Sequence, residues 1–316
     1  MKYELAHYSR QGGRATNEDR VAVAERYNAV IMVAADGLGG HSGGALAAEL
    51  LTETVTRTFL NIKQREIVSP SAFLALTILQ AHKLIIEQGR AHIPKIEPRT
   101  TCVVCLVQHG FAYWAHVGDS RLYHFRDDKL LQRTQDHSAI EQLRSDGVIT
   151  EEEMVHHPSK GRLLKCVGGP NKPTISLGQE TLLRTGDALL ICTDGVWQAF
   201  TPTELWKYLS YPSLDEGTEE MLLEAESKMG DVCDNLSAIS FRWQDRASRN
   251  APLQGNTAVQ IDEEGLLKNA AAAAAKKPRI PAKPVKHLKS RGQRRNSIDS
   301  DIRELEEYIK RFEPKS

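Results

Sequence analysis

The sequence lacks several features that would assign it at once to a broad class of protein. Its 316 residues carry a formal net charge of zero, so the chain as a whole shows no sign of affinity for nucleic acid or a membrane surface. No run approaches the roughly 18–20 apolar residues of a membrane span, and the first residues have no apolar signal-peptide core. Internal repeats at solenoid spacing are absent as well. We therefore expect a cytoplasmic protein with no membrane span.

Cysteine is scarce and odd in number. The five cysteines lie mostly in apolar surroundings, which is typical of reduced, buried thiols and not of a disulfide framework. Cys102 and Cys105 match the C-x-x-C spacing of redox and zinc sites, but both fall within an apolar run that predicts a strand. Because strand residues i and i+3 point to opposite faces, we interpret both as packing residues.

The zero net charge hides an acidic body and a basic tail. From Asp245 onward, 16 Lys or Arg residues stand against 10 Asp or Glu residues. Residues 276–295 hold nine Lys or Arg, no acid and three prolines, so this stretch cannot bury a core. We expect a globular domain over residues 1–243, a disordered linker over 244–300 and a short amphipathic helix over 301–316. The basic stretch is interpreted as a solvated tether, with docking to an acidic partner as the alternative; nucleic acid is the less favoured partner.

Apolar runs and capping signals predict a layered α+β domain rather than a repeated βαβ array. Helical spacing of apolar residues predicts one helix over 43–60 and another from 70 to about 88, with Ser69 as its N-cap. Capping boxes at Thr150 and Thr201 predict two further helices. Short β-rich runs predict strands near residues 3–8, 21–25, 29–35, 101–107, 111–117, 121–125, 188–192 and 236–243.

Two of these strand-like runs end on the dipeptide Asp-Gly. The first reaches Asp36 and the second reaches Asp194; Asp119 follows a third run, and Asp234 stands just before a fourth. A packed strand holds such an aspartate rigidly at its rim, and the glycine after it allows a sharp turn. Carboxylates that converge at strand ends repel one another unless a cation lies between them, and hard divalent cations prefer oxygen ligands. Taken singly, each could be an ordinary turn aspartate; together they predict a metal enzyme.

Five short motifs stand in a fixed order within residues 3–243: Arg14-Ala15-Thr16-Asn17-Glu18-Asp19, Asp36-Gly37-Leu38-Gly39-Gly40-His41, Val117-Gly118-Asp119-Ser120-Arg121, Thr193-Asp194-Gly195-Val196-Trp197 and Asp234-Asn235-Leu236-Ser237. This ordered set resembles the metal-dependent protein phosphatases of the phosphatase 2C family, particularly its bacterial members. The resemblance implies a sandwich of two facing β-sheets flanked by helices, in α/β/β/α layers. It also implies direct hydrolysis of phosphoserine and phosphothreonine on proteins, without a phosphoenzyme.

The resemblance further implies a binuclear Mn²⁺ or Mg²⁺ centre, with a third and weaker ion. Asp36 would bridge the two tightly bound ions, and the Gly37 carbonyl would bind one of them. Asp194 and Asp234 would be direct ligands. Asp119 would hold the third ion together with Asp194. Two such ions about 3.5–4 Å apart lower the pKa of a bridging water and stabilise in-line displacement.

Three residues of the first motif have implied roles near the substrate. Arg14 matches the residue that grips the substrate phosphate, as a guanidinium fork pairs bidentately with phosphoryl oxygens; its alternative is a surface charge. Glu18 or Asp19 would contribute to the metal centre through bound water.

Leu38 occupies the position at which eukaryotic members place a histidine, so no general acid is assigned. His41 is interpreted as organising its loop.

Residues 144–170 match the mobile flap of bacterial members of the family. Lys165 stands there in place of a customary arginine, so the resemblance leaves the substrate preference open. We expect a monomeric serine/threonine protein phosphatase whose partners are phosphoproteins and a cognate serine/threonine kinase. One alternative is a pseudophosphatase that binds without turnover, although the intact Asp36, Asp194 and Asp234 favour an enzyme. Another is a phosphatase dedicated to one phosphoprotein. Residues 294–297, Arg-Arg-Asn-Ser, resemble a basic-directed kinase site.

Overall fold

The computed structural model describes residues 1–38, 43–150 and 163–245. All of them belong to the first of two compact units, which spans Met1–Gly255. The helix expected after the Thr150 capping box falls within residues 151–162, outside the described residues. The linker expected over 244–300 and the helix expected over 301–316 lie almost entirely outside them too, so these domain boundaries stay predictions.

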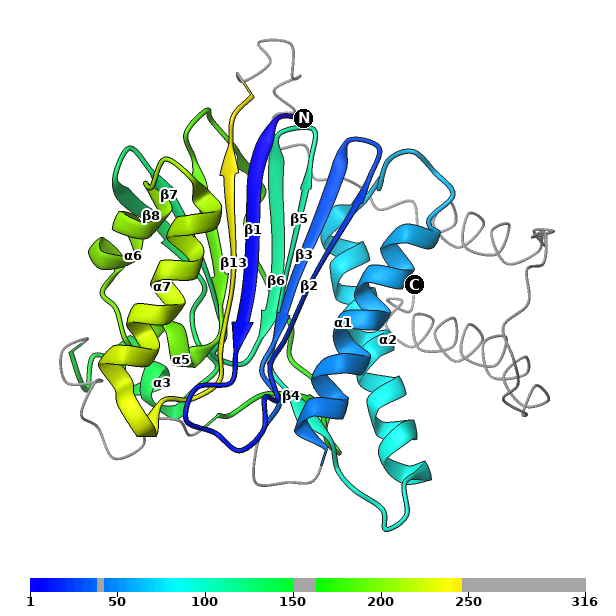
Figure 1. The fold of residues 1–316 in the computed structure, drawn as a ribbon. Helices are drawn as coiled ribbons and strands as arrows, with labels where there is room; N and C mark the ends of the chain where they lie inside the picture. Colours follow the sequence, from blue (N-terminus) through cyan, green and yellow to red (C-terminus); the bar gives the residue numbers. More distant parts are fainter. Residues whose placement is uncertain (39–42, 151–162, 246–316) are drawn as a thin grey trace, which may run out of the picture. The chain divides into compact units, whose positions relative to one another are not determined.

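Two antiparallel β-sheets face each other at the centre of this unit (Figure 1). The strand order in the first sheet is β1 (Tyr3–Arg10), β13 (Leu236–Trp243), β12 (Ala188–Cys192), β7 (Arg121–Arg126) and β8 (Lys129–Arg133). The order in the second sheet is β10 (Ser176–Leu177), β6 (Phe111–Val117), β5 (Cys102–Gln108), β3 (Ala29–Ala35) and β2 (Arg20–Arg26), and β11 (Thr181–Leu182) also pairs with β6. A separate pair is formed by β4 (Arg99–Thr100) and β9 (Val167–Gly168).

Helices cover the outer face of each sheet. The second sheet packs against α1 (Gly44–Asn61) and α2 (Pro70–Ala91). The first sheet packs against α5 (Asp194–Trp197), α6 (Pro202–Leu209) and α7 (Leu214–Met229). The described helices are completed by α3 (Ala139–Ser145) and the 3₁₀ helix η1 (Gly230–Val232). The predicted α+β sandwich with α/β/β/α layers is therefore confirmed.

Strand β3 explains why the central strands are apolar without interruption. Ile31 and Val33 face the α1–α2 layer, whereas Val30 and Met32 face the space between the sheets. Neighbouring residues of a strand point to opposite faces, so a strand in the middle of this sandwich has no face left for polar residues. Both runs that end in Asp-Gly are such strands, β3 and β12, and every residue of each is buried.

The two cysteines of the C-x-x-C pattern belong to different layers of the core. Cys102 packs with the α1–α2 layer, and Cys105 packs between the two sheets. Both are buried free thiols, and burial raises the pKa of each well above its usual range. A neutral thiol deep in the core is a poor nucleophile and a poor metal ligand. Their interpretation as packing residues is confirmed.

Helix starts follow the capping signals in part. At Thr201 the capping box is confirmed, because its hydroxyl accepts from the Glu204 amide at 3.3 Å and the Glu204 carboxylate accepts from the Thr201 amide at 2.7 Å. Ser69 precedes α2 as expected, but its side chain makes no capping hydrogen bond. Pro70 at the start of α2 has no amide hydrogen, which leaves one donor fewer to satisfy there.

The register of the strands brings the loops of interest to one end of their sheets. In the first sheet, Arg10 pairs with Leu236, and the end of β12 pairs with the start of β7. In the second sheet, Arg20 pairs with Ala35. These residues terminate their strands, so the loops beside them occupy the same end: 11–19, 36–38, 118–120, 193–195 and 233–235.

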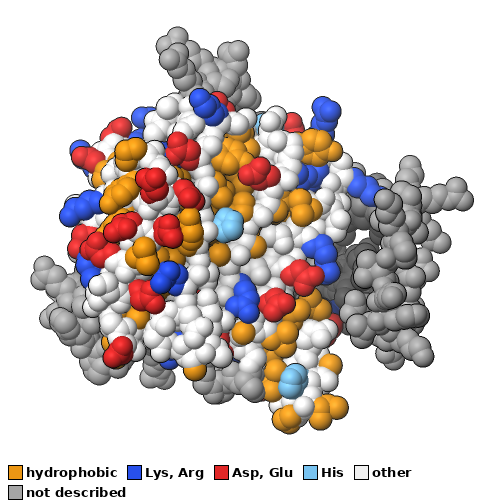
Figure 2. All heavy atoms as spheres, viewed as in Figure 1, with side chains coloured by type: hydrophobic (Ala, Val, Ile, Leu, Met, Phe, Trp, Pro, Cys, Tyr) orange, Lys and Arg blue, Asp and Glu red, His pale blue; other side chains and the backbone are white. Residues whose placement is uncertain are grey.

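The helical surface on the outer side of the first sheet is polar and acidic. Figure 2 shows Asp and Glu side chains gathered over α6 and α7. Asp215, Glu216, Glu219 and Glu220 all lie exposed on α7. This agrees with the acidic body expected from the charge distribution. Within the described ranges, no helix is both long enough and apolar enough to cross a membrane.

Candidate metal centre

Asp36 stands directly after β3, and its backbone is held at three points. Its amide donates to the Thr101 hydroxyl at 3.0 Å, and its carbonyl accepts from the Thr101 amide at 2.8 Å and the Thr100 hydroxyl at 2.9 Å. Burial raises the pKa of the Asp36 carboxyl well above its usual range. Four neighbouring carboxylates raise it further, those of Asp194, Asp19, Asp119 and Asp234. We refer to these five residues as the acidic cluster.

Asp194 and Asp19 are joined through Thr193. Asp194 is the first residue of α5, and its carboxylate accepts from the Gln198 amide group at 2.7 Å. The Thr193 hydroxyl donates to the buried Asp19 carboxylate at 2.7 Å. The pKa of Asp19 is raised to about 7, chiefly by burial and also by the charge of Asp194, against the opposing hydroxyl bonds to its carboxylate. The Asp19 carboxylate is therefore hydrogen-bonded to Thr193, the residue just before Asp194.

Arg14 and Asp234 form an ion pair across the mouth of the cluster. The Arg14 Nη2 atom lies 2.6 Å from an Asp234 carboxylate oxygen, although the two residues are 220 positions apart in the chain. The side chains are 59% and 37% exposed, so the pair is open to solvent. Glu18 lies nearby: burial raises the pKa of its carboxyl, and the positive charge of Arg14 opposes that shift. Arg14 is therefore placed where an incoming anion would meet a cation.

Asn235 fastens the loop of the first motif to β13. Its side-chain oxygen accepts from the Glu18 amide at 2.9 Å. Its side-chain nitrogen donates to the carbonyls of Gln11 at 2.8 Å and Thr16 at 3.0 Å. A buried amide that satisfies three backbone groups holds the loop in one position. Asn235 stands beside Asp234 in the fifth motif, but nothing in the sequence alone indicated this role.

Asp119 is a buried carboxyl at the end of β6, with 6% of its surface exposed. Its oxygen Oδ1 has no hydrogen-bond partner among the described residues. The pKa of Asp119 is raised to about 8, chiefly by burial and then by the charge of Asp194, against the opposing charge of Arg121. A buried carboxyl with an unpartnered oxygen and a neighbouring acid is typical of a site that receives a cation.

The glycines of the two Asp-Gly pairs have a different role from the one expected. A sharp turn was predicted at each glycine, but neither Gly37 nor Gly195 has a positive φ. A Cβ atom on Gly37 would lie 2.4 Å from the carbonyl carbon of Gly44, and one on Gly195 would lie 2.3 Å from the Asn235 carbonyl oxygen. Glycine is required at both positions because another backbone passes close to it.

The donor set fits hydrated hard cations. It consists of carboxylates, with the Gly37 carbonyl beside them, and Mg²⁺ and Mn²⁺ prefer such oxygen ligands. Among the described residues, no three His, Cys, Asp or Glu side chains are grouped so as to hold one ion. Mg²⁺ keeps several waters and is bound by only one or two carboxylates per ion, so a closed cage of side chains is not needed. The unpartnered Oδ1 of Asp119 offers one such oxygen.

The structure brings all eight predicted site residues to this end of the sandwich: Arg14, Glu18, Asp19, Asp36, Gly37, Asp119, Asp194 and Asp234. Their individual roles stay predictions. His41 lies outside the described residues, as does the middle of the predicted flap, residues 151–162. Lys165 is described and is half-buried; its charge, after burial and the neighbouring His116, helps lower the pKa of His137 to about 4.

Comparison with known proteins identifies close relatives over this domain. The family model named Protein phosphatase 2C matches residues 7–229. The serine/threonine phosphatase stp of Listeria monocytogenes is 31% identical over 232 residues, which cover 72% of this chain and 90% of that protein. The serine/threonine protein phosphatase PstP of Mycobacterium tuberculosis is 26% identical over 265 residues, 83% of this chain and 49% of PstP.

Solved structures agree with these relatives. The serine/threonine phosphatase of Streptococcus agalactiae has a TM-score of 0.70 at 25% identity, covering 77% of this chain and 100% of the other. The catalytic domain of PstP in complex with two manganese ions has a TM-score of 0.63 at 26% identity, covering 77% of this chain and 99% of the other. The chain therefore belongs to the protein phosphatase 2C family of serine/threonine phosphatases.

Proposed function

We propose that the acidic cluster binds two Mn²⁺ or Mg²⁺ ions for hydrolysis of phosphoserine and phosphothreonine on proteins. Asp36, Asp194, Asp234 and the Gly37 carbonyl would hold the two ions, with Asp36 shared between them. Asp119 and Asp194 would hold a third, weaker ion. The two manganese ions in the PstP catalytic domain support this count.

The observation that carries the proposal is the meeting of five carboxylates from five separate loops. Each member of the cluster follows or precedes a strand that packs in the sandwich. Like charges so arranged cost free energy, and a bound cation offsets that cost. Three of the five accept hydrogen bonds from Arg14, Gln198 and Thr193, which orient them. Such orientation from outside the ligand set is typical of metal sites.

When bound, the divalent ions supply an activated water and neutralise charge on the phosphoryl group. The chain itself supplies orientation. Thr100 and Thr101 fix the peptide of Asp36, which sets the point from which its carboxylate extends. Arg14 binds the phosphoryl oxygens, because its guanidinium has five N–H donors and only Nη2 is needed for Asp234. The ion pair with Asp234 thereby holds the Arg14 guanidinium, which receives the substrate phosphate.

Replacing Arg14 tests this assignment. Arg14→Lys keeps the charge and loses the fork, so kcat/KM on a phosphothreonine peptide should fall by roughly 10- to 100-fold, as expected for charge-assisted hydrogen bonds of about 1.5–3 kcal/mol. Steady-state kinetics should show much of the effect in KM. Arg57→Lys, on the exposed surface of α1, is the matched control. Unchanged kinetics in Arg14→Lys would mean that Arg14 is a surface charge that does not bind the substrate phosphate.

Metal removal tests the function as a whole. The purified chain treated with EDTA should hydrolyse neither p-nitrophenyl phosphate nor a phosphothreonine peptide, and added Mn²⁺ should restore both activities. Release of phosphate is the measurement. Equal activity with and without metal contradicts the proposal. Binding of the phosphopeptide in Mn²⁺ without any hydrolysis points to the second candidate, a pseudophosphatase; the complete set of acids favours the enzyme.

The partners follow from the chemistry of the reaction. We propose that phosphoproteins made by a cognate serine/threonine kinase are the substrates, and that the basic tail docks an acidic partner. A phosphatase dedicated to one phosphoprotein would act on that protein and only weakly on generic phosphopeptides. The expected monomeric state and cytoplasmic location stay predictions.

A further inference from the structure

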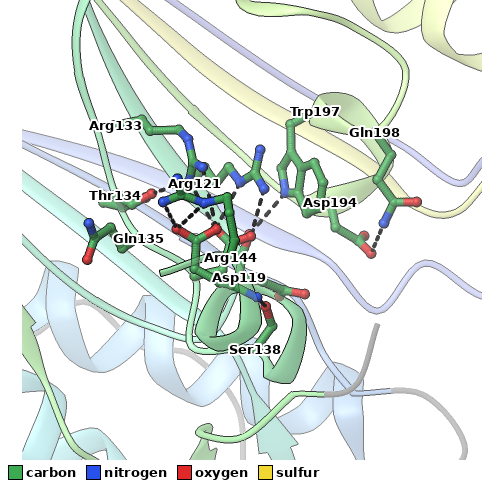
Figure 3. A network of polar contacts seen from close by, with 12 residues as sticks. Asp119, Arg121, Arg133, Thr134, Gln135, Ser138, Arg144, Asp194, Trp197 and Gln198 are labelled. Atoms are coloured by element: carbon green, nitrogen blue, oxygen red, sulfur yellow. Dashed lines mark hydrogen bonds and ion pairs between the residues drawn. The ribbon is translucent and has the colours of Figure 1, made fainter. Parts of the chain in front are cut away.

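Trp197 connects the two acids that are assigned to the third ion. Asp194 begins α5, and Trp197 ends it. The indole Nε1 of Trp197 donates a hydrogen bond of 3.0 Å to the backbone carbonyl of Asp119 (Figure 3). One short helix therefore carries the Asp194 carboxylate and also grips the residue that bears the opposing carboxylate.

Arg121 holds the indole ring in place. The guanidinium carbon of Arg121 lies 3.5 Å from the centroid of the Trp197 ring, which is a close stacking contact. The guanidinium is itself fixed by two bonds to Asp136, at 2.9 and 2.7 Å, and by a bond of 3.0 Å to the Tyr123 hydroxyl. Arg121 and Asp136 are both buried, so this support is rigid.

The same network extends to the helix beside the site. Arg133 lies 3.9 Å from Asp136 and 3.4 Å from Glu141, which belongs to α3. Arg144 binds Glu141 at 2.6 Å. Buried charges persist only when they are paired, and here the pairs form a chain from α3 to the indole of Trp197 (Figure 3). The position of Trp197 is thus fixed from outside its own helix.

The backbone of Asp119 sets the point from which its carboxylate extends. Oδ1 of Asp119 has no hydrogen-bond partner among the described residues, so hydrogen bonds do not orient that oxygen. The carbonyl of the same residue is held by Trp197. Trp197 also packs in the core between the first sheet and its helices, but packing alone requires only the ring and not the N–H group.

We propose that Trp197 is a positioning residue that sets the separation of Asp119 and Asp194, and thereby the affinity for the third divalent cation. This inference rests on the proposed function. Trp197 does not touch the ion or the substrate; it acts through the carbonyl of Asp119.

Trp197→Phe tests the inference, because phenylalanine keeps an aromatic ring over Arg121 and removes the N–H donor. Mn²⁺ binding to the full chain is followed by the electron paramagnetic resonance signal of free Mn²⁺, which reports binding without catalysis. We expect the weakest class of Mn²⁺ site to lose about tenfold in affinity, the low end for the loss of a group that orients a ligand. The tighter sites should be unchanged. Asp119→Asn should remove the same weak class.

Trp206→Phe is the matched control, because Trp206 packs in the same core, against the ring of Phe125. If Trp197→Phe does not fold, benzothienylalanine at position 197 replaces the N–H by sulfur at nearly constant shape and serves as the second variant. Unchanged Mn²⁺ affinity at every site, or an equal loss at all sites, overturns the inference.

Different results would disprove the proposed function and the role of Trp197. If the wild-type chain neither hydrolyses phosphate esters nor binds Mn²⁺, the proposed function is wrong. If the wild type does both, and Asp119→Asn removes a weak site that Trp197→Phe leaves intact, only the role of Trp197 is wrong.

Discussion

Asp36→Asn should lower kcat/KM on p-nitrophenyl phosphate by about 10³-fold or more in Mn²⁺. The ions supply several kcal/mol of transition-state stabilisation, and each 1.4 kcal/mol or so is a factor of ten in rate. Asn keeps the shape of the side chain and loses the negative charge that would bridge the ions. Initial rates over a Mn²⁺ titration are the measurement, and the loss should persist at saturating metal.

The same substitution should stabilise the metal-free protein. Asp36 is surrounded by four other carboxylates, so removal of its charge relieves repulsion. Thermal unfolding in EDTA should therefore give a higher midpoint for Asp36→Asn than for the wild type. Glu220 is an exposed acid on α7, and Glu220→Gln is the control. It should change neither kcat/KM nor the unfolding midpoint in EDTA. Full activity in Asp36→Asn contradicts the metal assignment, and a lower midpoint in EDTA contradicts the repulsion argument.

Asp187→Asn should destabilise the fold by about 3–5 kcal/mol, the usual cost of removing one partner from a buried ion pair. The Asp187 side chain is fully buried and receives two bonds from Arg126, at 2.7 and 2.6 Å, and one from His124 at 3.0 Å. Asn cannot accept both arms of the Arg126 fork. Urea unfolding at neutral pH measures the loss.

The pH dependence of this effect has a definite sign. Burial alone would raise the pKa of Asp187, but the bonds from Arg126 and His124 outweigh it and lower the pKa from 3.8 to about 2. A lowered pKa stabilises the fold above the unfolded value and loses that contribution as pH falls through the folded value. The difference between wild type and Asp187→Asn should therefore shrink between about pH 4 and pH 2.

An exposed ion pair provides the control for Asp187. Glu53 and Arg57 lie one turn apart on α1, with 59% and 61% of their side chains exposed. Glu53→Gln should cost no more than about 0.5 kcal/mol, because solvent screens such pairs. A cost below about 1 kcal/mol for Asp187→Asn, similar to this control, would mean that the buried pair contributes little.

The sequence predicted the layers and the acidic cluster because both depend on local patterns. Uninterrupted apolar runs mark strands that are buried on two faces, and Asp36 and Asp194 simply follow such runs. The strands β3, β6 and β12 have the predicted bounds, because strand ends are marked by the change to Gly, Asp or Thr.

Features that depend on distant contacts were not predicted. The bond from Trp197 to Asp119 joins residues 78 positions apart, and that from Thr193 to Asp19 joins residues 174 apart. The helix α7 was missed as well, because Gly217 and several acids interrupt its apolar pattern. Its buried residues do show helical spacing, as Leu214 and Met221 are seven positions apart.

The pairing of β1 with β13 determines when the site can exist. Among the described strands, β1 has β13 as its only partner, so the first strand of the domain can pair only after the last one has been made. Arg14 and Asp234 stand beside these two strands, 220 positions apart. A growing chain therefore carries an unpaired edge strand and an incomplete site until residue 243 is made. We therefore expect phosphatase activity only from the finished domain, so that a partly synthesised chain does not act on other phosphoproteins.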